Sequence, residues 1–230
     1  VRSVRVAYGH DEPATPTTLP TAFAGELLAW EATRGVALLR VDDGHGGRAF
    51  EVAWRGEAPR ARVAARARHA LVAPRGVATE QGAAFFIGEF EREVGDAGRC
   101  MTVGEGMCVR PVALYVLLAG APGAPLARVD ITPAGLPDAL TARGAELTAL
   151  FLAGTPGHGE TLDAEQRAVR VDVARREVTT LTLTPPEGFG AIDTPTLVAC
   201  DDGVWLAAEV AVAPQGRRAV TALPLECLAR

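Results

Sequence analysis

Residues 167–209, RAVRVDVARREVTTLTLTPPEGFGAIDTPTLVACDDGVWLAAE, decide the fold. Apolar and polar residues alternate over Val169–Val173 and again over Val178–Thr182, which is the two-residue period of strands. The loop Pro185–Gly188 follows, and the hairpin dipeptide Asp202-Gly203 then separates two further apolar runs. This stretch therefore predicts a strand, a turn, a strand, a loop and a hairpin, in that order.

Short apolar runs recur between Gly, Pro and Asp residues along the rest of the chain. They are five to nine residues long, which is short for helices: Glu26–Trp30, Gly35–Val41, Ala83–Phe90, Val112–Ala119, Leu147–Ala153 and Val204–Val212. Two stretches are candidates for a helix from their residue composition and the spacing of their apolar residues, Ala61–Leu71 and Pro137–Leu152. We interpret both as strand or connection, and Gly144 weakens a helix in the second. The predicted fold class is all-β.

Two internal similarities predict a structural repeat. The triplet Arg-Val-Asp occurs at Arg40–Asp42, Arg128–Asp130 and Arg170–Asp172, with starts 88 and 42 residues apart. Apolar runs led by glycine, and often closed by glutamate, begin at residues 25, 82, 144 and 203. A period of 42–44 residues relates the triplets to one another.

Residues 167–209 resemble one blade of a β-propeller, since such a blade is a small antiparallel sheet repeated with a period of this size. The resemblance is clearest over residues 125–230, and the chain has no signature of a specific propeller family. It implies propeller-like repeats of short antiparallel strands within one β-rich domain over residues 1–230, as part of a longer chain or ring. A β-sandwich is the alternative, and it predicts cleaner polar alternation on one wet face.

Composition and charge limit the partners. The net charge is −5, and all 23 basic residues are arginine, with no lysine or asparagine, which indicates a GC-rich bacterial genome. An acidic chain repels a polyanion, so we predict no nucleic-acid partner. The arginine-rich stretch Arg55–Arg75 is interpreted as a solvated strand pair, with a surface for an acidic partner as the alternative. No run of 18 apolar residues exists, which predicts no membrane span.

Four cysteines allow two disulfides. The spacing of Cys100 and Cys108 suits a staple across a hairpin, and Cys200 and Cys227 could be joined across the last segment. Disulfides predict a periplasmic or extracellular location. Free buried thiols in a cytoplasmic protein are the alternative.

Catalytic signatures are missing from the sequence. Ser3 is the only serine, so Gly-x-Ser-x-Gly cannot occur, and the absence of lysine excludes a P-loop and Schiff-base chemistry. Asp42, Asp43 and His45 lie together in a glycine-rich turn that is a candidate Ca²⁺ site, with an exposed hairpin as the alternative. We therefore predict no catalytic residues and no cofactor other than Ca²⁺.

Three glutamates, Glu31, Glu89 and Glu209, close or follow the repeated apolar strands. If the repeats are real, these residues line one rim and bind a ligand there. Strand-end charges that face solvent are the alternative.

The predicted function is a non-catalytic binding or scaffold module with a protein partner, exported as a subunit of a bacterial surface assembly. One alternative is a glycan-active enzyme that uses the rim carboxylates. The other is a purely structural subunit whose sheet edges are completed by a partner chain.

Overall fold

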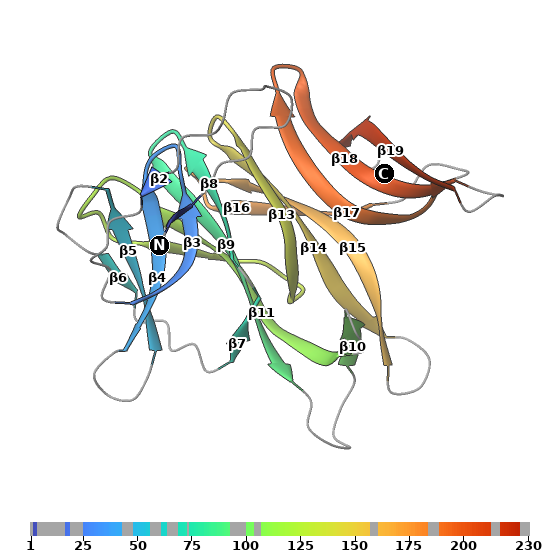
Figure 1. The fold of residues 1–230 in the computed structure, drawn as a ribbon, viewed down its shortest axis with the longest axis horizontal. Coiled ribbons are helices and arrows are strands. Elements are labelled where there is room, and N and C mark those ends of the chain that lie inside the picture. Colours follow the sequence, from blue (N-terminus) through green and yellow to red (C-terminus); the bar gives the residue numbers. More distant parts are fainter. Residues whose placement is uncertain are drawn as a thin grey trace.

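The structure, a computed structural model, is built almost entirely of strands (Figure 1). It describes residues 2–3, 17–18, 25–42, 48–55, 61–63, 69–72, 74–92, 100–103, 107–156, 161–183, 189–212 and 217–225. Over these residues 19 strands form and there is no helical element. None of the described segments is a helix that could cross a membrane.

The strands fall into four consecutive units. Unit 1 is the four-stranded antiparallel sheet β3 (Glu26–Glu31), β4 (Val36–Asp42), β5 (Arg48–Trp54) and β6 (Ala61–Val63). Unit 2 contains β7 (Ala70–Leu71), β8 (Arg75–Thr79), β9 (Gly82–Arg92), β10 (Cys100–Val103), β11 (Met107–Ala119) and β12 (Ala127–Asp130). Unit 3 is β13 (Gly135–Arg143), β14 (Glu146–Pro156), β15 (Thr161–Asp172) and β16 (Glu177–Thr182). Unit 4 is β17 (Phe189–Cys200), β18 (Gly203–Val212) and β19 (Arg217–Pro224). A separate pair joins β1 (Arg2–Ser3) to β2 (Thr17–Thr18).

Unit 2 keeps the four-strand plan but divides its two outer positions. The central strands β9 and β11 pair along most of their length. β8 and β7 share one edge of β9, and β12 and β10 share the far edge of β11. A short parallel pairing of β10 with β15 joins units 2 and 3 into one ten-stranded sheet.

Apolar side chains fill the space between successive units. Phe85 and Phe86 are neighbours in β9 and both are fully buried, yet they point to opposite faces. Phe85 packs with Leu38 and Phe50 of unit 1, whereas Phe86 packs with Phe151 of unit 3. A third cluster joins units 3 and 4 through Leu150 of β14, Ala168 of β15, and Leu197 and Leu206 of the last unit. Units 2 and 3 are therefore covered on both faces, which the β-sandwich alternative does not allow.

The first strand of each unit lies on the inner side of the stack. β3 lies against β8, β8 against β13, and β13 against β17. Consecutive antiparallel sheets that stack through their faces, with their first strands side by side, are the arrangement of propeller blades. The all-β, propeller-like prediction is confirmed. The strand interpretation of Pro137–Leu152 is also confirmed, because these residues form the β13–β14 hairpin, with the bend at Gly144.

The repeat is present, but the predicted period of 42–44 residues and the Arg-Val-Asp marker are wrong. The Arg-Val-Asp triplets lie in β4, β12 and β15, which are the second, fourth and third strands of their units. The glycines predicted at residues 82, 144 and 203 lie in or directly after the turns that precede β9, β14 and β18, whereas Gly25 precedes the first strand β3 and its place in unit 1 belongs to Gly35. The same turn of each unit is thus marked by Gly35, Gly82, Gly144 and Gly203. These are 47, 62 and 59 residues apart, because the loops differ in length from unit to unit.

Candidate functional site on the turn rim

Four tight turns lie along one edge of the molecule, the upper edge in Figure 1. Each joins the first strand of a unit to the second, and together residues 32–35, 80–81, 144–145 and 201–202 are called the turn rim. Backbone conformation explains the glycines here, since Gly35 and Gly144 have φ of 68° and 59°, in the left-handed region that glycine adopts without strain. Local sequence therefore favours the turns of units 1 and 3.

Two arginines connect neighbouring turns. Arg34 Nη2 donates to the backbone carbonyl of Glu80 over 3.1 Å, which joins unit 1 to unit 2. Arg143 Nη2 donates to the backbone carbonyl of Asp201 over 2.6 Å, which joins unit 3 to unit 4. Each acceptor is the first residue of its tight turn, whereas the donors differ in position: Arg34 lies within the first turn and Arg143 is the last residue of β13. Neither arginine was singled out by sequence reasoning, because an acceptor carbonyl 46 or 58 residues away leaves no local pattern.

Between units 2 and 3 the turn rim carries a shallow depression. Its volume is about 250 Å³, including the solvent above it, and its lining comes from three turns: Thr79, Glu80, Gln81, Gly144, Ala145, Val173 and Ala174. Val173 N donates to Ala145 O over 2.9 Å, which ties the β15–β16 turn to the same edge. The depression is too shallow to enclose a small molecule.

Glu31 lies on the turn rim and has a structural role there. Its carboxylate accepts hydrogen bonds from the backbone N–H groups of Thr33 at 2.8 Å and Arg34 at 2.6 Å, and the residue is only 5% exposed. This carboxylate therefore holds the first turn closed and orients Arg34 toward Glu80.

Glu89 is buried between units 1 and 2. It accepts a hydrogen bond from the Tyr115 hydroxyl at 2.9 Å, and Arg128 stacks over the Tyr115 ring with its guanidinium carbon 3.8 Å from the ring centre. Burial raises the pKa of Tyr115 far above its ordinary value, and the neighbouring Glu89 carboxylate adds to the rise while Arg128 opposes it. The tyrosine therefore stays protonated as a hydrogen-bond donor.

The expectation that the three glutamates share one rim does not hold for Glu31 and Glu89. Strand direction is the reason: β3 runs toward the turn rim and ends there at Glu31, whereas β9 starts at the turn rim and carries Glu89 away from it. Glu209 lies in β18, opposite Asp193 and Val220, and β18 also runs away from the turn rim. Ligand binding by these residues stays a prediction.

The candidate Ca²⁺ site lies mostly outside the described residues. Asp42 is exposed at the end of β4, opposite Arg48, while Asp43 and His45 are not described. Among the residues that are, no three acidic, histidine or cysteine side chains are grouped as metal ligands. The Ca²⁺ hypothesis is untested by this geometry.

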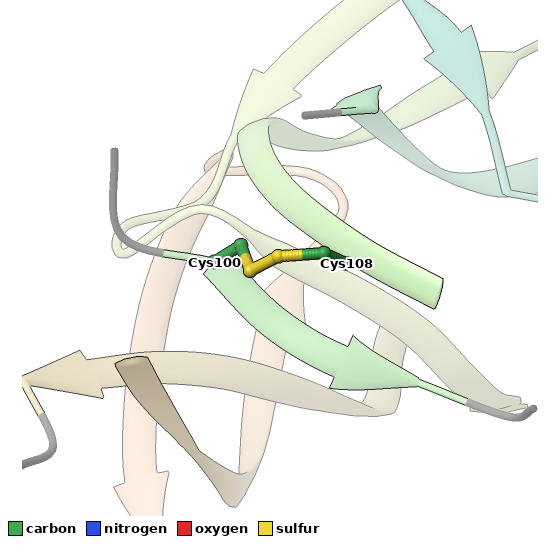
Figure 2. The surroundings of a disulfide bond; sticks show 2 residues. All are labelled: Cys100 and Cys108. Atoms are coloured by element: carbon green, nitrogen blue, oxygen red, sulfur yellow. A yellow bond between two sulfur atoms is a disulfide. The ribbon is translucent and has the colours of Figure 1, made fainter. Parts of the chain in front are cut away.

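The predicted Cys100–Cys108 disulfide is confirmed. The bond joins β10 to β11 across the hairpin, with 5.5 Å between the two Cα atoms (Figure 2). The prediction for Cys200 is wrong, because this residue has a free, exposed thiol. In the register of β17 with β18, Cys200 lies opposite Gly203, and its predicted partner Cys227 is outside the described residues.

Sequence reasoning also missed an ionic cluster at the opposite edge of unit 2. Glu91 pairs with Arg110 across β9 and β11, and its other oxygen lies 3.2 Å from His69 Nδ1. The hydrogen bond from Arg110 lowers the pKa of Glu91. His69 belongs to the arginine-rich stretch, so in this part of the stretch a carboxylate faces the histidine rather than an external anion.

Comparison with known proteins establishes no family. No protein-family model and no curated protein matches the chain. Among solved structures, the apocarotenoid oxygenase of Synechocystis is 10% identical, with 86% of this chain and 46% of that chain covered and a TM-score of 0.49. The α-L-arabinanase of Cellvibrio cellulosa, solved with arabinohexaose, is 12% identical, with 84% and 71% covered and a TM-score of 0.35. The chain thus spans less than half the length of the oxygenase, and similarity this low says nothing about activity. The all-β fold stands on the strand order and packing described above.

Proposed function

We propose that this chain is a non-catalytic binding or scaffold module, and that the turn rim is its contact surface for a protein partner. The observation that carries the proposal is the pair of hydrogen bonds from Arg34 to the Glu80 carbonyl and from Arg143 to the Asp201 carbonyl, each of which joins neighbouring units. They hold turns of different units in register, so the surface is ordered before a partner arrives. Such preorganisation lowers the entropic cost of binding.

The charges on the turn rim favour a protein over a polyanion. Arg34 and Arg143 are exposed beside the acidic side chains of Glu80, Asp201 and Asp202. Both signs therefore alternate along the edge, and alternating charge gives specificity for a complementary protein surface. A nucleic acid would need a continuous basic stripe instead.

The carboxylates support a non-catalytic role. Glu31 is occupied by two backbone amides and Glu89 by the Tyr115 hydroxyl. A glycoside hydrolase needs two carboxyl groups about 5–10 Å apart that both face the substrate. These two face the interior of the protein, which favours binding over glycan chemistry.

Surface charge can be reversed without breaking the turn contacts, because the acceptors are backbone carbonyls. The double variant E80R/D201R keeps both acceptors and reverses two exposed charges, whereas R92E reverses a charge at the far end of β9. Quantitative affinity capture from the native source should enrich a partner with the wild type and with R92E, and lose it with E80R/D201R. Equal enrichment by all three proteins, or none by the wild type, contradicts the proposal.

The glycan-active alternative is tested on the same preparations. Release of reducing ends from a panel of plant and bacterial polysaccharides is measured for the wild type and for E31Q. We expect none from either protein. Turnover that is lost in E31Q while the fold is retained would establish the enzyme and overturn the non-catalytic proposal.

We also propose that the module is exported to the periplasm or the cell exterior. The Cys100–Cys108 disulfide supports this location, since disulfides persist in oxidising compartments. Thiol-trapping of the protein in intact native cells tests it: both cysteines should resist alkylation until a reductant is added.

A further inference from the structure

Units 2, 3 and 4 share the same two-residue turn between their first and second strands. In each unit the strand register leaves two residues between the paired ends of the strands, which are Thr79 and Gly82, Arg143 and Glu146, and Cys200 and Gly203. The first residues of the three turns therefore occupy equivalent positions, and they are Glu80, Gly144 and Asp201.

Two of these three equivalent backbone carbonyls accept a hydrogen bond from an arginine. Arg34 donates to the carbonyl of Glu80, and Arg143 donates to the carbonyl of Asp201. No described arginine donates to the third carbonyl, that of Gly144. The depression lies at this third junction, between units 2 and 3. The chain thus closes two junctions of the turn rim with an arginine and leaves a depression at the other.

Thr79 explains why the depression is there. It is the last residue of β8, as Arg143 is the last residue of β13, so it holds the position from which Arg143 reaches the next unit. A threonine side chain is too short to make the same contact. Thr79 is 8% exposed and lines the depression instead. The repeat itself therefore shows which chemical group is missing at this junction, namely a guanidinium.

The lining of the depression suits an arginine side chain. A Cβ on Gly144 would lie 3.5 Å from Oε1 of Glu80, so this carboxylate of unit 2 lies beside the turn of unit 3. Ala145, Val173 and Ala174 supply apolar surface for the methylene groups of an arginine. A carboxylate and a backbone carbonyl side by side accept the charge-assisted hydrogen bonds that a guanidinium donates.

The charges around the depression leave the Glu80 carboxylate available. In the neighbouring β15–β16 turn, Arg175 Nε lies 4.0 Å from the Asp172 carboxylate, and the exposed Arg176 is followed by the exposed Glu177. Positive and negative charges of that turn therefore offset each other. The Glu80 carboxylate forms no hydrogen bond or ion pair with the described residues, so its charge is free for an incoming cation.

We infer that an arginine side chain of the protein partner enters the depression and donates to the Gly144 carbonyl and the Glu80 carboxylate. The inference rests on the proposed function, because it names the chemistry by which the turn rim recognises its partner. Arginine is favoured over lysine, since its planar guanidinium presents several donors in a fixed geometry and can bind both acceptors at once. Only the end of the side chain has to enter, which agrees with the shallow shape.

The probe is the peptide acetyl-Gly-Arg-Gly-amide, titrated into the full chain and followed by NMR. The backbone amides of Gly144, Ala145 and Val173 should shift saturably, and binding should be weak because one side chain supplies the contacts. The same peptide with citrulline in place of arginine keeps the shape and lacks the charge, so it should bind at least about threefold more weakly. Added salt should weaken binding of the arginine peptide.

Two variants test where the peptide binds. T79R supplies the missing arginine from the chain itself and should abolish the shifts, whereas T179R adds the same residue at an exposed position of β16 and should not. E80Q removes the charge but keeps the carbonyl that Arg34 binds, so it tests the site even where T79R fails to fold. It should weaken binding at least about threefold. E177Q, which neutralises another exposed carboxylate, is its control.

Equal binding of the arginine and citrulline peptides, or shifts that T79R and E80Q leave intact, overturns the inference. The affinity capture separates this inference from the proposed function. A partner that is lost with E80R/D201R but kept with T79R overturns the arginine contact and leaves the turn rim as the binding surface. A wild-type capture that enriches no partner overturns the proposed function, and this inference with it, even where the peptides bind.

Discussion

Arg143 and Asp201 lie 58 residues apart in the sequence, yet the guanidinium of the first donates to the backbone carbonyl of the second over 2.6 Å. The acceptor is a main-chain atom at the first position of the β17–β18 turn. The contact therefore depends on the backbone conformation of the turn and not on the Asp201 side chain. Arg34 recognises the turn at Glu80 in the same way.

Replacing Arg143 with alanine should loosen unit 4. A surface hydrogen bond from a charged donor contributes about 1 kcal/mol, so the free energy of unfolding in urea should fall by about that amount. Hydrogen exchange should accelerate at the backbone amides near the β17–β18 turn. R175A, at an exposed position in the β15–β16 turn, is the control and should change stability by less than about 0.5 kcal/mol. Equal losses in both variants would mean that the Arg143 contact contributes nothing specific.

Glu31 should stabilise the chain through the first turn. E31A removes the acceptor of two backbone N–H groups near a buried site, so we expect a loss of about 2 kcal/mol in urea unfolding. E31Q retains one amide oxygen and should lose about half as much. Glu177 is exposed, and E177A serves as the control for removal of a strand-end carboxylate. If E31A matches E177A, the capping role is wrong.

Sequence patterns predicted the strands because their causes are local. The alternation through Val169 and Val171 appears in the structure as burial against unit 2, and the glycine at residue 144 appears as the bend of a hairpin. The Arg-Val-Asp triplets gave a wrong repeat length, because Arg and Val are common in this sequence and Asp commonly ends a strand. Strand position within a unit depends on pairing with distant residues, which the triplets do not encode.

The candidate site was less accessible from sequence. Glu31 and Glu209 end similar four-residue sequences, Leu-Ala-Trp-Glu and Leu-Ala-Ala-Glu. Glu31, however, is the last residue of a first strand, whereas Glu209 lies within a second strand that runs in the opposite direction. Antiparallel topology therefore sends similar motifs to opposite edges. The turn rim depends on arginine side chains that reach carbonyls in the next unit, a contact that needs the stack to exist first.

Gly82 lies against the backbone at the end of β11 and leaves no room for a side chain. A Cβ at this position would lie 2.0 Å from the Ala119 carbonyl oxygen and 2.6 Å from that of Gly120, so the backbone must move to accept it. G82A should therefore destabilise the protein by at least about 3 kcal/mol, as measured by thermal or urea unfolding. At Gly120 an added Cβ meets only the Ala124 Cβ at 3.6 Å, so G120A should be nearly neutral. Similar losses in both variants would contradict the close contact.

Tyr115 should make the protein sensitive to alkali. Its folded pKa is raised well above the ordinary value of 10.0, so its stabilisation is complete below about pH 10, where the folded and unfolded states both hold the proton. Above that pH the unfolded state loses the proton first, and the free energy of unfolding falls by up to about 1.4 kcal/mol per pH unit. Urea unfolding from about pH 8 to about pH 11 measures this slope. Y115F should be less stable at pH 8, because Glu89 loses its donor, and should show a shallower slope above pH 10.

Breaking the Cys100–Cys108 bond should destabilise the β10–β11 hairpin without removing the core. The cysteines are eight residues apart, and the chain-entropy model gives about 2.5 kcal/mol for a loop of this size. The double variant C100S/C108S should unfold at lower urea concentration by about that free energy. C200S is the control, since its thiol is free, and it should unfold like the wild type. Because β10 also pairs with β15, hydrogen exchange should accelerate at the start of β15 in the double variant and not in C200S. If exchange there is unchanged, the disulfide stabilises only its own hairpin, and the junction between units 2 and 3 is held by the apolar cluster around Phe86 and Phe151.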